Sequence, residues 1–340
     1  MNKKQLIETA NALVGSEKGL LAMDESIPTC NKRFAQLGIP QTVEMRRAYR
    51  EMIVTTPRLG ESISGAILSD ETIRQQTRRG VPMVKELTDA GIVPGIKVDE
   101  GAKAMASFPG EKVTEGLDGL RDRFAEYSGM GARFAKWRAV ITIGEGIPTW
   151  GCIYANAHAL ARYAALCQEA NLLPIVEPEV LMDGNHTLEQ CFEVTEKVQR
   201  AVFSELIVQR ILLEGMILKP NMVVSGKDSP QQATVDEVAD ATVTCLLRTA
   251  PAAVPAVAFL SGGQSGEQAA AHLNSMNVRY KSRTPWVLTF SFARAIQQPA
   301  MEIWKGDDTK VPAAQRALNQ SASIARAARR GQFEPAMVTG

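Results

Sequence analysis

The sequence predicts one domain with the fold of a closed (β/α)8 barrel, a TIM barrel, and three observations support this prediction. Short apolar segments recur along the 340 residues, separated by roughly thirty to forty residues. Apolar residues at helical spacing lie between these segments, as strand and helix alternation requires. No linker rich in proline, glycine or serine interrupts the chain, so we expect residues 1–340 to form a single barrel.

The apolar segments are expected to be buried parallel strands, because each is a short run rich in apolar residues that ends near a charged, hydroxyl or glycine residue. We identify eight of them, at residues 19–24, 64–69, 93–99, 134–140, 172–177, 215–219, 257–261 and 286–291. In a barrel of this kind the carboxyl ends of the strands form the active face. The residues that end the strands are therefore the first place to look for chemistry.

Helices are predicted between the strands. The capping-box spacing that begins a helix occurs twice, at Thr234 with Glu237 and at Ser265 with Gln268. An alanine-rich segment that carries several arginines predicts a C-terminal helix over residues 312–330. The remaining residues, 331–340, are expected to form a loose tail.

Composition and charge favour a small-molecule enzyme of the cytoplasm. Lys plus Arg (38) nearly balances Asp plus Glu (37), so no field of one sign favours nucleic acid or an anionic membrane as a partner. The five cysteines are odd in number and include no Cys-x-x-Cys pair, which suggests neither a disulfide framework nor a zinc cluster. No run reaches ~18 apolar residues, so we expect no membrane span.

Metal-dependent chemistry is not expected. The sequence has three histidines, and none lies at metal-ligand spacing from another. A catalytic zinc ion usually takes two or three imidazoles. We therefore predict neither a metal nor another cofactor.

Lys219 is the most informative residue, because it places a cation where the apolar strand 215–219 ends. A buried ammonium must either pair its charge or lower its pKa until the neutral amine is available as a nucleophile. A nearby ammonium, such as that of Lys136, would favour the second outcome. The neutral amine would attack a ketone and form a Schiff base.

Ionisable residues end several other predicted strands. Asp24, Lys97, Lys136 with Arg138, and Glu177 with Glu179 should meet at the same mouth as Lys219. For any single pair, a structural ion pair explains the residues equally well. The complete set is better explained by catalysis, because a structural mouth does not need so many buried charges.

Two groups of residues could hold phosphate. Ser261-Gly-Gly and Ser291-Phe-Ala-Arg294 follow the last two strands, which is the usual phosphate position in such barrels. At the opposite side of the mouth, Ser26, Thr29, Arg33 and Lys97 could hold a second phosphate, although an ordinary helix start would explain the hydroxyl residues. Two phosphate sites would suit a bisphosphate substrate.

Seven segments also carry a family resemblance: LAMDES (21–26), GIKVD (95–99), FAKWR (134–138), VEPE (176–179), EGMILKPN (214–221), FLSGGQS (259–265) and TFSFAR (289–294). Along nearly its whole length, the sequence resembles the class I, Schiff-base fructose-1,6-bisphosphate aldolases. The resemblance implies reversible cleavage of fructose 1,6-bisphosphate to dihydroxyacetone phosphate and glyceraldehyde 3-phosphate. It also implies a role in glycolysis, gluconeogenesis or the Calvin cycle.

The same resemblance implies the catalytic roles. Lys219 would form the iminium with the ketose C2, and Glu177 would shuttle protons during its formation and hydrolysis. Glu179 would support the lysine network, Asp24 would take the proton of the C4 hydroxyl, and Lys136 would polarise the reacting oxygens.

The resemblance further implies the substrate-binding residues. The phosphate of dihydroxyacetone phosphate would be bound by Leu260, Ser261, Gly262, Ser291, Ala293 and Arg294. The other end of the substrate would be bound by Ser26, Thr29, Arg33, Lys97 and Arg138. Two departures from the family pattern are alanine at 293, where several relatives have glycine, and the end at Gly340, where many relatives have a longer tail closed by tyrosine. We expect the backbone amide of Ala293 still to serve and the carbon chemistry to be unaffected.

Two alternatives remain open from the residues. A Schiff-base aldolase for sedoheptulose 1,7-bisphosphate or another sugar phosphate would use the same groups. A non-enzymatic scaffold would keep the fold but would not need Asp24, Lys136, Glu177 and Lys219 together. The resemblance also implies a homo-oligomer, a tetramer.

Overall fold

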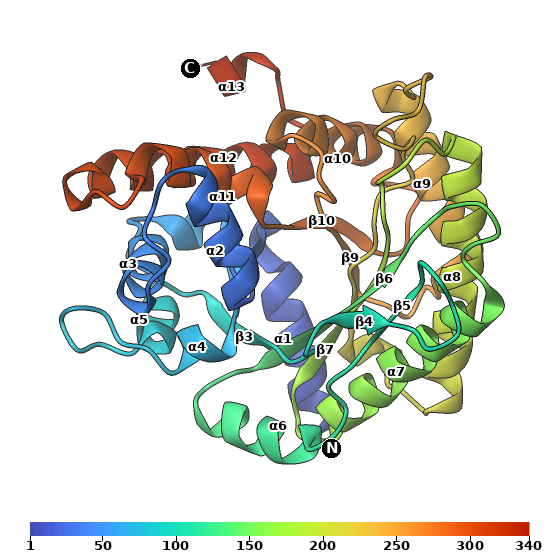
Figure 1. The fold of residues 1–340 in the computed structure, drawn as a ribbon, viewed down its shortest axis with the longest axis horizontal. Helices are drawn as coiled ribbons and strands as arrows, with labels where there is room; N and C mark the ends of the chain where they lie inside the picture. Colours follow the sequence, from blue (N-terminus) through green and yellow to red (C-terminus); the bar gives the residue numbers. More distant parts are fainter. Residues whose placement is uncertain (340) are drawn as a thin grey trace.

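The computed structural model describes residues 1–339 and contains a closed barrel of parallel strands, which confirms the predicted fold class (Figure 1). The strands follow one another around the barrel in the order β1-β10-β9-β8-β7-β6-β3-β2. Their bounds are Gly19–Ala22 (β1), Ile63–Leu68 (β2), Val93–Lys97 (β3), Phe134–Ile141 (β6), Leu173–Val180 (β7), Ile217–Leu218 (β8), Ala256–Phe259 (β9) and Val287–Phe292 (β10). Every predicted strand overlaps one of them.

The register of the strands brings the charged residues of neighbouring strands side by side. Lys97 of β3 is paired with Lys136 of β6, and Arg138 of β6 is paired with Glu177 of β7. The backbone N–H of Lys219, directly after β8, donates to the carbonyl of Val176 in β7 at 2.8 Å. Parallel pairing therefore gathers these residues at one end of the barrel.

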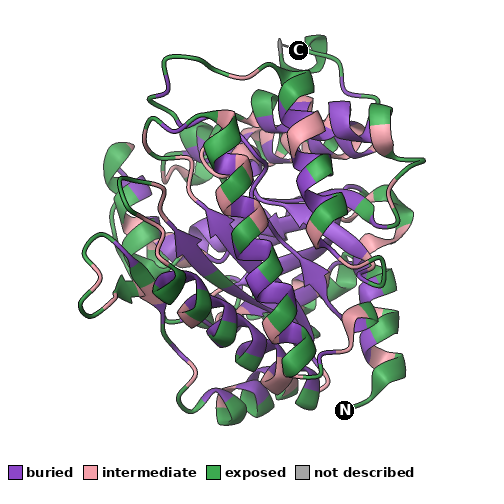
Figure 2. Cartoon of the chain, turned by 90° about the vertical axis from the view of Figure 1, so that its right-hand side faces the viewer, coloured by how far each residue is buried: buried purple, intermediate pink, exposed green. Residues whose placement is uncertain are grey.

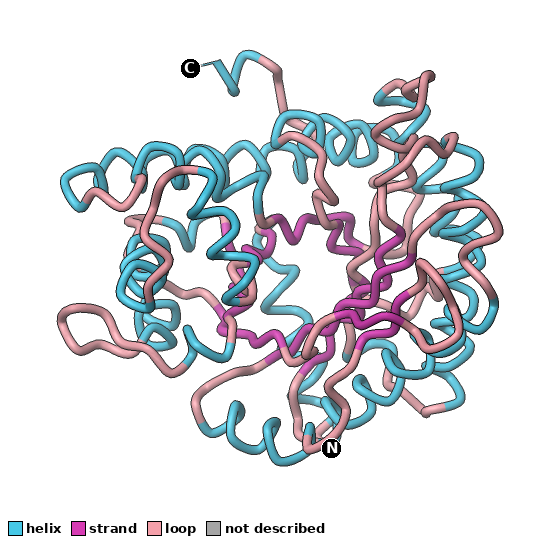
Figure 3. The backbone as a smooth tube through the Cα atoms, in the orientation of Figure 1, coloured by secondary structure: helices cyan, strands magenta, loops and turns pink. Residues whose placement is uncertain are grey.

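Helices surround the barrel and bury its outer face, as Figures 2 and 3 show. The helices that follow the strands or flank them are α2 (Ile27–Gln36), α3 (Val43–Val54), α4 (Asp70–Ile73), α5 (Met83–Asp89), α6 (Leu120–Gly129), α7 (Trp150–Glu169), α8 (Leu188–Val208), α9 (Val235–Thr249), α10 (Gly266–Tyr280) and α11 (Arg294–Trp304). Both expected capping boxes form, at Thr234 with Glu237 and at Ser265 with Gln268. A third capping box, which the sequence analysis missed, begins α8 at Thr187 with Gln190.

The first helix, α1 (Lys3–Val14), closes the bottom of the barrel. Its buried residues Leu6, Ala10 and Leu13 belong to the same apolar cluster as Phe134 and Ile217 of the strands. The helix therefore places a packed apolar layer below the polar mouth. The sequence analysis did not predict this role.

Two further features lie outside the alternating pattern. A small antiparallel hairpin, β4 (Ala102–Ala104) with β5 (Lys112–Thr114), follows β3 and was not predicted. At the C-terminus, α12 (Val311–Arg330) packs against α10 and α11, and a short helix, α13 (Ala336–Thr339), lies in the segment expected to be a loose tail. Within residues 1–339, the helices are all too short or too polar to span a bilayer.

Candidate active site

A cavity of about 1240 Å³ opens at the carboxyl ends of the barrel strands. Every residue that the sequence analysis assigned to catalysis or substrate binding lines it. These residues are Asp24, Ser26, Thr29, Arg33, Lys97, Lys136, Arg138, Glu177, Glu179, Lys219, Leu260, Ser261, Gly262, Ser291, Ala293 and Arg294. The barrel thus brings together side chains that lie up to 270 residues apart in the sequence, from Asp24 to Arg294.

Four of these side chains form a buried row of alternating charge. Lys136 Nζ lies 2.7 Å from Asp24 Oδ2 and 3.1 Å from Glu177 Oε2. Glu177 Oε1 lies in turn 3.1 Å from Lys219 Nζ. We call Asp24, Lys136, Glu177 and Lys219 the charge row. Its two lysines and two carboxylates cancel in net charge, which makes the burial of all four tolerable.

The electrostatics of the charge row keep its carboxylates ionised. Burial opposes ionisation of Asp24, but the charges of Lys136 and Lys219 outweigh it and lower the pKa of Asp24 to about 2. For Glu177 the same lysines, with Arg138, outweigh burial and lower the pKa. Burial alone would lower the pKa of Lys136, but Asp24 and Glu177 raise it well above its usual value. Lys136 is therefore held as an ammonium.

Lys219 is buried to the same degree as Lys136, with 4% of each side chain exposed, but it has fewer ionic partners. The sequence analysis left two possibilities for this residue, a paired charge or a lowered pKa. Among residues 1–339, Lys219 Nζ has one ionic partner, Glu177 Oε1. The charge of Lys136, which was expected to act on Lys219, is offset by its own two carboxylates.

The second carboxylate of β7, Glu179, serves a different partner. Its Oε2 accepts a short hydrogen bond from Arg138 Nε, and among the ion pairs of residues 1–339 Glu179 forms none with a lysine. Lys97 pairs with Asp99 at 2.8 Å, and Asp99 also accepts the backbone N–H of Arg138 at 3.2 Å. Asp99 and Glu179 thereby orient the cations at this side of the mouth.

The loop after β1 contains a carboxylate whose function the sequence analysis missed. Glu25 is the residue next to Asp24, and its side chain pairs with Arg33 through a short contact and with Arg50 at 2.8 Å. Arg33 is also held by Gln298 at 3.1 Å. Glu25 thus fixes Arg33 at the cavity wall, a role that only the fold reveals because Arg50 and Gln298 are remote in sequence.

The ends of β9 and β10 form a small, donor-rich wall. Gly262 has a positive φ of 57°, a conformation that glycine adopts without strain, so the chain turns sharply after Ser261. The hydroxyl of Ser291 is buried and has no hydrogen-bond partner within residues 1–339. Arg294 begins α11, where the free N–H groups of the first turn favour an anion. The wall therefore offers donors that a phosphate would satisfy.

None of the three histidines lines the active-site cavity. Within residues 1–339 there is also no group of three or more histidine, cysteine, aspartate or glutamate side chains arranged to hold a metal ion. The cations of the mouth are instead the ammonium and guanidinium groups of its own side chains.

Comparisons with known proteins agree on one family. The family model described as "Fructose-bisphosphate aldolase class-I" matches residues 5–340. A "Probable fructose-bisphosphate aldolase class 1" from Xanthomonas campestris pv. campestris is 59% identical over 91% of this chain and 92% of its own. A "Fructose-bisphosphate aldolase 4, cytosolic" from Arabidopsis thaliana is 48% identical over 92% of this chain and 80% of its own.

A solved structure supports the same relationship. The fructose-bisphosphate aldolase from Plasmodium falciparum, solved as a ternary complex with TRAP and a small-molecule inhibitor, superposes with a TM-score of 0.95. It is 46% identical in sequence, and the match covers 97% of this chain and 95% of that one. The similarity therefore extends over the whole barrel.

Proposed function

Because the chain belongs to the class I fructose-bisphosphate aldolase family, we propose that its cleavage of fructose 1,6-bisphosphate proceeds through a Schiff base on Lys219. The enzyme is a lyase whose products are dihydroxyacetone phosphate and glyceraldehyde 3-phosphate. The observation that carries the proposal is the charge row, in which Lys219 is buried and meets a single carboxylate, Glu177.

The first step uses the 3.1 Å contact between Lys219 and Glu177. Transfer of one proton from Nζ to the carboxylate gives a free amine and a carboxylic acid together. The amine attacks C2 of the ketose, and its nitrogen passes one proton to the former carbonyl oxygen. The acid returns its own proton to the same oxygen, which then leaves as water. The product is an iminium that carries one positive charge on nitrogen.

Cleavage then draws electrons into this iminium. Asp24, which the charges of Lys136 and Lys219 hold ionised, takes the proton of the C4 hydroxyl. The C3–C4 bond breaks, its electron pair forms the enamine, and glyceraldehyde 3-phosphate leaves. Because the ammonium of Lys136 makes Asp24 a weak base, we infer that substrate draws Lys136 from Asp24 onto its own oxygens before this step. Protonation of the enamine at C3 and hydrolysis release dihydroxyacetone phosphate and restore Lys219.

The two ends of the cavity suit the two phosphates. We assign the phosphate of dihydroxyacetone phosphate to the wall formed by Ser261, Gly262, Ser291, Ala293 and Arg294, with Leu260 beside it, because the buried Ser291 hydroxyl has no partner there. We assign the other phosphate to Ser26, Thr29, Arg33, Lys97 and Arg138. Glu179 positions Arg138 through their hydrogen bond, and Glu25 positions Arg33.

Chemical trapping tests the role of Lys219. Borohydride added with dihydroxyacetone phosphate should reduce the iminium to a stable amine. The peptide that contains Lys219 should then gain the mass of the substrate less one oxygen atom, because water is lost and two hydrogens are added. The Lys219→Ala variant should show neither the adduct nor turnover. An adduct on another lysine, with turnover retained in Lys219→Ala, would disprove the assignment. A non-enzymatic scaffold would give no adduct at all.

Sedoheptulose 1,7-bisphosphate is a second substrate that the two phosphate ends could accept. The family assignment favours fructose 1,6-bisphosphate. Comparison of kcat/KM for the two bisphosphates would measure the preference, and we expect the larger value for the fructose compound.

The cellular setting and assembly are also part of the proposal. All five cysteines are free and buried, which suits a reducing cytoplasm, and the Arabidopsis relative is named cytosolic.

We further propose that the protein forms a homotetramer. Large apolar side chains such as Ile207 and Val208 at the end of α8 are more than 60% exposed, which suits a surface covered by another subunit. Light scattering during gel filtration would measure the subunit number.

A further inference from the structure

A second cavity, of about 510 Å³, lies at the opposite end of the barrel from the active site. It is lined by residues that directly precede the first strands, together with one arginine of α12: Lys18, Arg58, Gly60, Glu61, Ala90 and Arg326. We call this cavity the lower pocket. Its wall residues Lys18 and Glu61 precede β1 and β2, so it opens at the amino-terminal face.

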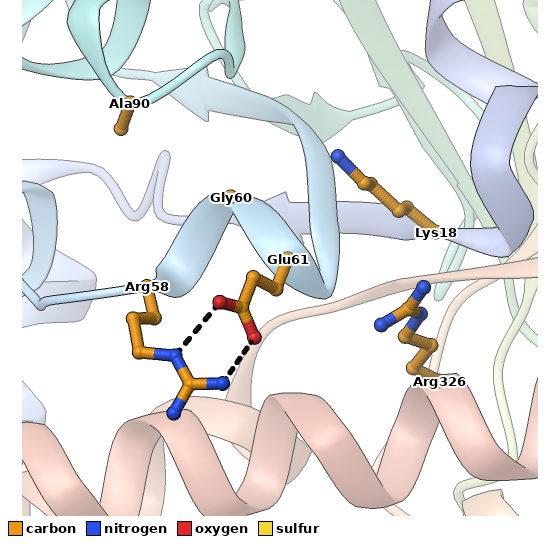
Figure 4. A pocket seen from close by; sticks show the side chains of 6 residues that line it. All are labelled: Lys18, Arg58, Gly60, Glu61, Ala90 and Arg326. Atoms are coloured by element: carbon orange, nitrogen blue, oxygen red, sulfur yellow. Dashed lines mark hydrogen bonds and ion pairs between the residues drawn. The ribbon is translucent and has the colours of Figure 1, made fainter.

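The charges that line the lower pocket are not balanced. Arg58 donates from Nε and Nη2 to the two oxygens of Glu61, at 2.7 and 2.9 Å, so these two side chains neutralise each other (Figure 4). Lys18 and Arg326 lie on the other side of the pocket in Figure 4. Among the residues that the structure describes, neither forms an ion pair with a carboxylate. Glu61 is also within electrostatic reach of Lys18 and Arg326, but one carboxylate faces three cations, so the lining keeps a net charge of +2.

Arg326 also lacks a hydrogen bond that it needs. Its Nε is buried and finds no acceptor within residues 1–339. A buried donor left unsatisfied is destabilising, and more so where the group is charged. The next turn of α12 adds to the positive field: burial, together with the charges of Arg326 and Arg330, lowers the pKa of Arg329 to about 10.

A simpler explanation accounts for part of this pattern. Cations near the C-terminus of a helix are favoured by the helix dipole, and Arg329 and Arg330 lie in the last turn of α12. That explanation does not extend to Lys18, which lies outside α12, between η1 (Gly15–Glu17) and β1. It also does not account for an open cavity between Lys18 and Arg326.

We propose that the lower pocket binds the phosphate group of a small phosphorylated metabolite, with Lys18 and Arg326 as its charge partners. A phosphate monoester carries close to two negative charges at neutral pH and so matches the two unpaired cations. A guanidinium can donate two parallel hydrogen bonds to phosphate oxygens, which would satisfy the buried Nε of Arg326. The volume lies within the range of small-ligand sites.

An occupant of the lower pocket would touch a helix that also borders the active site. Ser321, Ile324 and Ala325 of α12 line the active-site cavity, and Arg326 is the next residue along the same helix. The lower pocket is nevertheless separate from the phosphate positions proposed above, since it shares no lining residue with the active-site cavity.

Calorimetry on the full chain can test the proposal. The active site is first saturated with a hexitol 1,6-bisphosphate, which has two phosphates but no carbonyl and so cannot form the iminium. Inorganic phosphate is then titrated in. We expect one phosphate to bind per chain, and Arg326→Gln and Lys18→Gln each to weaken this binding by at least about tenfold. No phosphate binding by the unmodified chain, or equal binding by Arg326→Gln, would overturn the proposal.

Arg316→Gln is the matched control, because Arg316 is an exposed arginine of the same helix and lines neither cavity. It should bind phosphate like the unmodified chain. All three variants should keep the kcat/KM of the unmodified chain for fructose 1,6-bisphosphate. An unchanged kcat/KM would show that they fold, and it would separate a failure of phosphate binding in the lower pocket from a failure of the Lys219 mechanism. If Arg316→Gln weakened binding as much as Arg326→Gln did, a diffuse field of α12 would replace the lower pocket as the explanation.

Sedimentation with vesicles that contain phosphatidic acid distinguishes a free metabolite from a lipid headgroup. None of the large exposed apolar side chains lines the lower pocket, so nothing there would enter a bilayer. We expect the protein to stay in the supernatant. Sedimentation that is lost in Arg326→Gln would assign the pocket to a lipid and overturn the small-molecule proposal.

Discussion

At the scale of single residues, Lys136 and Lys219 show how surroundings assign different tasks to one side-chain type. Both are buried with 4% of their side chains exposed, and both contact Glu177. Lys136 has a second carboxylate, Asp24, and its pKa is raised. Lys219 contacts one carboxylate among the described residues, Glu177. This difference supports Lys219 as the nucleophile and Lys136 as a lasting positive charge.

Glu177→Gln should slow formation of the iminium by roughly a hundredfold to ten-thousandfold, because the amide can neither take the proton of Lys219 nor protonate the departing oxygen. The measurement is the rate of borohydride trapping with dihydroxyacetone phosphate. Glu179→Gln is the matched control from the same strand. Its iminium should form at nearly the normal rate, while a looser Arg138 should raise KM. An unchanged trapping rate in Glu177→Gln would exclude the shuttle role.

Asp24→Asn should remove a pH-dependent part of the folding stability. The pKa of Asp24 is lowered from 3.8 to about 2, so its contribution is present above pH 3.8 and is lost as the pH falls through 2. At pH 7 the variant should be less stable by about 2 kcal/mol, and the difference should shrink between pH 4 and pH 2. Urea unfolding at several pH values measures this.

Asp118→Asn is the control for that measurement, because Asp118 is exposed. Its free energy of unfolding should stay within about 0.5 kcal/mol of the unmodified chain. A constant difference between Asp24→Asn and the unmodified chain from pH 7 to pH 2 would contradict the ionic role of Asp24.

At the scale of elements, α1 shows that a helix outside the repeating pattern can complete the barrel. Its apolar residues occupy the bottom of the barrel, where the strands alone would leave an opening. Leu13 of α1 lies so close to Gly65 of β2 that a Cβ atom at position 65 would come within 2.5 Å of Leu13 Cδ2. Glycine is needed there to admit the helix.

Leu13→Ala should lower the free energy of unfolding by about 2–5 kcal/mol, since it leaves a cavity in a fully buried layer. Ile7→Ala on the same helix should cost much less, because Ile7 is 37% exposed. Urea unfolding of both variants makes the comparison. Equal costs would mean that α1 does not close the barrel in solution.

The hairpin β4–β5 and the strand β8 show why elements differ in how readily they are predicted. β8 has only two residues in ladder pairing, yet the apolar run at residues 215–219 identified it. Each strand of the hairpin has three residues and carries no run of apolar side chains. Its two strands pair in an antiparallel ladder, and next to the ladder the backbone N–H of Met105 donates to the carbonyl of Glu111 at 3.0 Å. Periodicity along the chain does not reveal such pairing.

At the scale of the whole molecule, barrel closure is what creates the active site. In the charge row, Lys136 and Glu177 lie within β6 and β7, while Asp24 and Lys219 follow β1 and β8. None of these strands could hold the other three side chains in place. The closed ring of strands holds all four side chains together.

EDTA should leave turnover of fructose 1,6-bisphosphate unchanged, because the electron sink in the proposed reaction is the iminium of Lys219. The assay is kcat and KM before and after incubation with the chelator. Loss of activity that added zinc restores would contradict the proposed chemistry, since it would require a metal to polarise the ketose carbonyl.

The sequence by itself determined the alternation of strands and helices, the family and the residues at the mouth of the barrel. These features follow from the spacing of nearby residues and from motifs such as EGMILKPN, so they can be predicted from the sequence alone. Only the tertiary structure decided which charges neutralise one another. Glu177 lies between two lysines, Glu179 pairs with Arg138, and Glu25 pairs with Arg33 and Arg50. Such pairings depend on distances between remote residues, and a few ångströms decide whether a buried charge is compensated.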